Sequence, residues 1–102
     1  MKECCEKYLN EQFGGDPEIV KEIYGEYVAS VRAKLQEAET ELSEGKWAAL
    51  DRVAHTIKGN ALAVGDAAMS KTAIDLRHAA NIGDRASAAA LVESLKELSG
   101  LL

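Results

Sequence analysis

The sequence is poor in residues that interrupt helices and has no segment suited to a membrane. Pro17 is the single proline among 102 residues. No apolar run approaches the roughly 18 residues of a membrane helix, and residues 1–12 lack the apolar core of a signal peptide. Neither a strand-like alternation nor an internal repeat is present. These absences leave a small, cytoplasmic, all-α protein as the expectation.

Basic charge and cysteine are also scarce. Twelve Lys and Arg residues face 17 Asp and Glu residues, so the net charge is −5, and no Lys/Arg run offers a local site for nucleic-acid phosphates. The only cysteines, Cys4 and Cys5, are neighbours. Adjacent cysteines bridge each other only with strain, and two thiols cannot complete a four-ligand metal site. We therefore expect no nucleic-acid binding, no membrane association, no metal and a reducing compartment.

The longest amphipathic segment has clear signals at both ends. Asp16 suits a helix N-cap, Pro17 the first helical position, and Gly45 the C-terminal stop. Between these ends, apolar residues recur at the steps of one helical stripe. The stripe comprises Ile19, Ile23, Tyr27, Val31, Leu35, Ala38 and Leu42. The spacing predicts a helix of about seven turns.

Three shorter amphipathic segments follow. They begin near residues 46, 66 and 84 and stop near Gly65, Gly83 and Gly100, and a weaker helix is expected over residues 2–12. Connections of a few residues force neighbouring helices to run antiparallel. We therefore expect an antiparallel up-down-up-down four-helix bundle with a short N-terminal helix capping one end, and a single domain over residues 1–102.

Gly59 does not fit the packing of such a bundle. A glycine inside a helix costs roughly 1 kcal/mol relative to alanine, and the apolar stripe continues past it to Val64, so Gly59 does not end the helix. At about 100° per residue, His55 and Gly59 lie away from the stripe, Lys58 lies at its margin and Leu62 outside the core. The segment predicts an outward imidazole beside an ammonium, bare backbone and an exposed leucine.

An outward histidine without a pocket suits a reaction between two proteins. A solvated imidazole is largely neutral at neutral pH, and its outer ring nitrogen is a nucleophile. Without a pocket or an oxyanion hole, His55 would be a poor catalyst for a small substrate. Lys58 would support negative charge on a phosphoryl group attached to His55, and Gly59 would admit the partner's loops.

Each of these residues also has an ordinary interpretation. A surface histidine or lysine is usually only solvated, and a helical glycine is often merely tolerated. The joint spacing of His55, Lys58 and Gly59 is what favours a function. His78 has no Lys-Gly pair behind it and is expected to be an ordinary surface side chain. A di-iron site is disfavoured because the chain lacks Glu-x-x-His pairs.

The segment from Ala54 to Gly59, with Gly65 ten residues after the histidine, resembles the signature of histidine-containing phosphotransfer (Hpt) domains. Its flanks match as well. Residues 14–18 resemble the family's start of the long helix, residues 45–50 the beginning of the histidine helix, and residues 81–84 the turn before the closing helix. The resemblance covers nearly the whole chain.

The resemblance implies a phosphorelay intermediate and not a turnover enzyme. His55 would take a phosphoryl group from a receiver-domain aspartyl phosphate and pass it to another receiver's aspartate. Lys58 would be its electrostatic support, and Gly59, Asn60 and Leu62 would form the docking face. No cofactor is implied, since the Mg²⁺ of the transfer belongs to the receiver. The implied partners of the monomeric chain are response-regulator receivers and a hybrid histidine kinase.

Arg77 departs from the family pattern, in which many members carry Glu or Gln at this place, twenty-two residues after the histidine. It is either a second cation for the phosphoryl group or a solvated arginine paired with a nearby acid. Two other functions stay open: the phosphoacceptor domain of a chemotaxis-type histidine kinase, and a receiver-binding module that does not transfer, against which His55 and Lys58 argue. The start at Met1 and the stop at Leu102, without a linker, lead us to expect a stand-alone protein.

Overall fold

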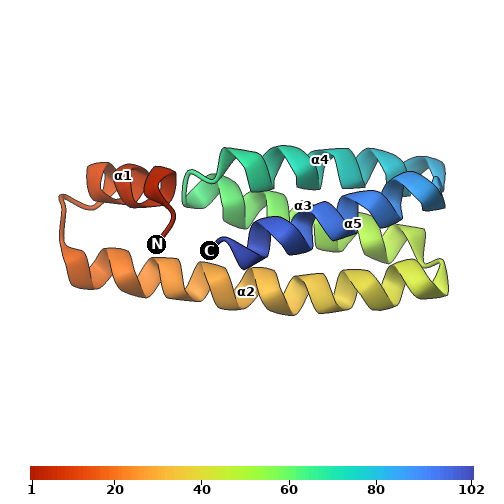
Figure 1. The fold of residues 1–102 in the computed structure, drawn as a ribbon, viewed down its shortest axis with the longest axis horizontal. Helices are drawn as coiled ribbons and strands as arrows, with labels where there is room; N and C mark the ends of the chain where they lie inside the picture. The colour runs from red at the N-terminus through yellow and green to blue at the C-terminus, as the bar shows by residue number, and fades with distance from the viewer.

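Five α-helices make up the computed structural model, which describes residues 1–102 (Figure 1). They are α1 (Glu3–Gln12), α2 (Pro17–Glu44), α3 (Trp47–Ala63), α4 (Ala67–Ile82) and α5 (Arg85–Gly100). The predicted all-α class is confirmed. None of the five combines enough length with enough apolarity to cross a bilayer.

The helices begin and end at the residues that the sequence signals indicate. The carboxylates of Asp16, Asp66 and Asp84 cap α2, α4 and α5 by accepting hydrogen bonds from first-turn backbone N–H groups. Gly45 and Gly83 end α2 and α4 in the left-handed region, at φ of 69° and 66°. Glycine adopts this conformation without steric cost. The resulting tight turns bring successive helices side by side.

Helices α2 to α5 form the predicted antiparallel four-helix bundle. Each of them packs against the next in sequence, and α5 closes the ring against α2. The largest fully buried apolar side chains of the bundle are Val31, Leu50, Ile57, Met69, Leu76 and Leu95. Most helical stability in proteins comes from packing of an amphipathic face, so the burial of these stripes stabilises α3, α4 and α5.

The N-terminal part of α2 extends beyond its neighbours, and α1 covers it. The 28 residues of α2 correspond to about 42 Å at 1.5 Å per residue, close to the longest dimension of the molecule, 43 Å. In Figure 1, α1 lies beside this end of α2 and next to the turn between α3 and α4. The N-terminal helix therefore caps one end of the bundle, as predicted.

A buried carboxylate ties the N-terminus to the bundle. Asp66, only 1% exposed, accepts a 2.8 Å bond from Lys2 Nζ and a 2.7 Å bond from the Tyr27 hydroxyl. Burial, together with this bond, raises the pKa of the Tyr27 hydroxyl, which keeps it protonated as a donor. The cap of α4 is thus also the meeting point of the N-terminus, α2 and the α3–α4 turn, a role that its sequence position did not reveal.

The prediction that Ile19 belongs to the buried stripe of α2 is wrong. Ile19 is 42% exposed, whereas Val20 and Tyr24 are buried. At this end, α2 meets α1 and the chain termini. The Tyr24 hydroxyl accepts a bond from the Lys2 backbone N–H at 3.1 Å and donates to the Leu102 carbonyl at 3.3 Å. Val20 lies one turn before Tyr24 on the same side, so the neighbours at this end select Val20 over Ile19 for burial.

Two glycine substitutions should change stability in opposite directions. Gly65 has φ of +74°, and an added Cβ would lie 2.6 Å from Cβ and Cγ of Tyr8 in α1. We expect Gly65→Ala to lower the free energy of unfolding by about 2 kcal/mol or more, because backbone strain and a displaced Tyr8 both contribute.

Gly25 is helical with no atom within 4 Å of an added Cβ. We therefore expect Gly25→Ala to raise the free energy of unfolding by about 0.5–1 kcal/mol.

Urea unfolding followed by circular dichroism measures both changes. A Gly65→Ala variant as stable as the wild type would contradict the contact between α1 and the α3–α4 turn.

Candidate functional site

His55 projects into solvent from the middle of α3. It is exposed, whereas Ala54 and Ile57, close to it in the helix, are fully buried in the core. The stripe that faces the bundle therefore turns the imidazole outward, in the direction that the helical wheel indicates.

The surface next to His55 is open and carries an unpaired cation. Gly59 is exposed one turn along α3, and an added Cβ there would meet no atom within 4 Å. Its φ is not positive, so the fold does not require glycine at this position. Leu62 is 57% exposed, and Lys58 is half-buried and belongs to none of the ion pairs. The imidazole thus stands beside bare backbone, a free ammonium and an exposed leucine.

Arg77 of α4 reaches across to α3 and contacts the imidazole. Its Nη1 lies 3.0 Å from His55 Nδ1, and its Nε donates to Asp51 Oδ1 at 2.9 Å. Asp51 and His55 are one turn apart on α3, so both lie within reach of one guanidinium. Arg77 thus has the nearby acidic partner that one interpretation expected, and its role toward a phosphoryl group stays a prediction. Asp51 was missed, although its spacing of four residues from His55 is a signal that could have identified it.

A shallow, mostly polar hollow adjoins this contact between α3 and α4. The residues that line it are Lys58, Ile74, Arg77, His78 and Asn81. His78 is exposed, in agreement with its predicted position on the helix surface. Two cationic side chains, Lys58 and Arg77, therefore line this hollow, although the whole chain carries a net charge of −5. Arginine and lysine donors in this arrangement suit phosphoryl oxygens.

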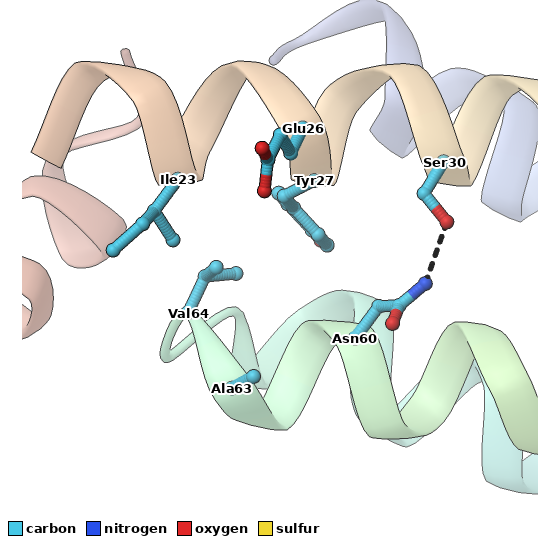
Figure 2. A pocket seen from close by; sticks show the side chains of 7 residues that line it. All are labelled: Ile23, Glu26, Tyr27, Ser30, Asn60, Ala63 and Val64. Atoms are coloured by element: carbon cyan, nitrogen blue, oxygen red, sulfur yellow. Dashed lines mark hydrogen bonds between the residues drawn. The ribbon is translucent and has the colours of Figure 1, made fainter. Parts of the chain in front are cut away.

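Asn60 faces another neighbour. Figure 2 shows its amide at a groove between α2 and α3, where Nδ2 donates to Ser30 Oγ at 2.8 Å. The other residues that line this groove are Ile23, Glu26, Tyr27, Ala63 and Val64. The Asn60 amide is thus directed toward α2, whereas the imidazole of His55 contacts α4.

The remaining histidine, cysteine and acidic side chains form neither a metal-ligand cluster nor a disulfide. No three His, Cys, Asp or Glu side chains lie together as metal ligands would. Cys4 and Cys5 are free thiols with their Sγ atoms 3.9 Å apart. Burial raises the pKa of Cys5 to about 12, which makes its thiol a poor nucleophile at neutral pH. The candidate site is therefore the surface around His55.

Comparison with protein-family models matched residues 22–102 to the Hpt domain. The match begins inside α2 and includes all of α3, α4 and α5, and with them every residue of the site around His55. Helix α1 and the first residues of α2 precede it. No curated protein and no solved structure matched the chain.

Proposed function

The chain belongs to the Hpt-domain family, and on this basis we propose that His55 is the residue that carries the phosphoryl group. Membership implies histidine phosphotransfer in a phosphorelay, where such domains act as intermediates and not as turnover enzymes and interact with receiver domains. The chain has two histidines, and one observation favours His55: its exposed ring contacts Arg77 and lies one helical turn from both Lys58 and the open surface at Gly59.

The transfer is an in-line displacement at phosphorus between two side chains. A ring nitrogen of His55 forms the N–P bond while the P–O bond to a receiver aspartate breaks and the electron pair leaves with the carboxylate. Such a reaction depends on orientation and on charge stabilisation. The buried side of α3 orients the imidazole. Lys58, which belongs to none of the ion pairs, supplies positive charge for the phosphoryl oxygens.

The receiver would dock on the exposed side of α3. Gly59 allows its loops to approach the helix backbone, and Leu62 offers an apolar contact that is 57% exposed. Asn60 would meet the receiver only at the edge of this face, because its amide is engaged with Ser30. Both the donor and the acceptor are then receiver aspartates that use the same face in turn.

Substitution of His55 should abolish labelling. After incubation with a receiver domain that carries a ³²P-labelled aspartyl phosphate, the wild type should become labelled. The label should be acid-labile and base-stable, as a phosphoramidate is. His55→Gln should carry none, because glutamine has no nucleophilic ring nitrogen, and His78→Gln serves as the control that keeps the label. Both side chains are exposed, so circular dichroism should show the same helix content in all three proteins. Label retained by His55→Gln would refute the assignment.

A larger side chain at Gly59 should separate transfer from folding. We expect Gly59→Gln to stabilise α3 by up to about 1 kcal/mol while slowing transfer from a receiver at least tenfold, since the new side chain occupies the space of the partner's loops. Gly25→Gln is the matched control: Gly25 is also helical with open space around it, but lies on α2. Quench-flow measurement of phosphoryl transfer compares the two. Equal transfer rates in wild type and Gly59→Gln would contradict the proposal that the receiver's loops approach the backbone of α3 at Gly59.

A further inference from the structure

The contact between Arg77 and His55 involves one particular ring nitrogen. Nη1 of Arg77 lies 3.0 Å from Nδ1 of His55, while Asp51 holds Nε of the same guanidinium at 2.9 Å. A guanidinium has five N–H donors and no acceptor, and it stays protonated in proteins. Nδ1 must therefore accept this bond with its lone pair. A neutral imidazole in this contact carries its single proton on Nε2.

This tautomer is not the reactive one. With Nδ1 engaged by Arg77, Nε2 is the ring nitrogen left for a docked partner. Nε2 can attack phosphorus only with a free lone pair, which requires the ring proton to be on Nδ1. Arg77 cannot accept a bond from an Nδ1–H group, so the contact must open before Nε2 reacts.

Asp51 makes that opening costly. The Arg77 and Asp51 side chains are only 31% and 23% exposed, so their ion pair is partly shielded from water. Asp51 lies on the same helix as His55, one turn away, and thus holds the guanidinium next to the ring. Lys58, the other cation at the site, has no acidic partner. Asp51 therefore pairs with Arg77 and not with Lys58.

After phosphorylation, the His55 ring can again accept the hydrogen bond from Arg77. When Nε2 displaces the aspartate carboxylate, the product ring bears the phosphoryl group on Nε2, a proton on Nδ1 and a positive charge. Loss of the Nδ1 proton to water restores a lone pair that Arg77 can contact. Onward transfer needs this proton back on Nδ1, so that imidazole leaves as a neutral group. Arg77 competes with the proton for the same lone pair.

We infer that Arg77 is a positioning residue that, held by Asp51, sets the tautomer of His55 and so slows both phosphorylation of the ring and loss of the phosphoryl group. The inference rests on His55 as the phosphoacceptor for its kinetic consequence, but its structural part concerns the unphosphorylated protein. Arg77 would thus lengthen the lifetime of the phosphorylated intermediate.

The tautomer can be measured on the unphosphorylated protein by ¹⁵N NMR of the two histidines. In the wild type, His55 should show an unprotonated Nδ1 and a protonated Nε2, whereas the solvated His78 should show a mixture of both tautomers. In Arg77→Gln, whose amide oxygen can accept from Nδ1–H, the His55 signals should shift toward the Nδ1–H form. Arg52→Gln removes the same charge one turn before His55 without removing a bond to the ring, and should leave the signals unchanged.

Two NMR results would overturn the inference: a wild-type His55 with the same tautomer mixture as His78, or identical His55 signals in wild type and Arg77→Gln. The first needs no variant, so it holds even if a substitution disturbs folding.

The kinetic consequence can be tested without a partner protein. With phosphoramidate as donor and ³¹P NMR as readout, Arg77→Gln should be loaded faster than the wild type and should lose its phosphoryl group about fivefold faster, the factor that one hydrogen bond is typically worth. Arg52→Gln should match the wild type. Equal lifetimes in wild type and Arg77→Gln would overturn the kinetic role of Arg77. Label on His78 instead of His55 would overturn the phosphoacceptor assignment and leave the tautomer measurement standing.

Discussion

The burial of one side of α3 is the constraint on which the site depends. Leu50, Ala54 and Ile57 are fully enclosed by the bundle, and side chains on a helix follow one another at about 100°. A rotation of α3 that turned His55 inward would expose this side, at about 1.5–3 kcal/mol for each large apolar side chain. The imidazole is therefore oriented by packing on the opposite side of its own helix. A side chain placed in this way needs no loop to hold it.

Local charge at the site differs in sign from the charge of the whole chain. The net charge is −5, yet Lys58 and Arg77 lie beside the imidazole, and the nearby Asp51 is engaged by the guanidinium of Arg77. The overall negative charge disfavours nucleic acid, while the local positive charge favours a phosphoryl group. The same guanidinium also lies 3.0 Å from Nδ1 of His55.

Helix α1 adds a separate contact region at the far end of α2. It lies outside the residues matched to the family, and its attachment depends on the Lys2–Asp66 ion pair and on the approach of Tyr8 to Gly65. Because α2 extends beyond α3 and α5, its apolar end would be open to water without this cover. Asp66 combines two tasks here, since it caps α4 and also binds the N-terminus.

Helix number, helix ends and the outward direction of His55 could all be predicted, because they depend on interactions within a few residues: aspartate caps, left-handed glycines and a 3.6-residue period. Whatever depends on the neighbouring helix could not. The exposure of Ile19, the turn of Asn60 toward Ser30 and the bond from Arg77 to His55 each depend on which surface lies alongside. Partners 22 or 30 residues apart meet only once the bundle has closed, and periodicity within one helix does not specify which side chains then come within hydrogen-bond distance.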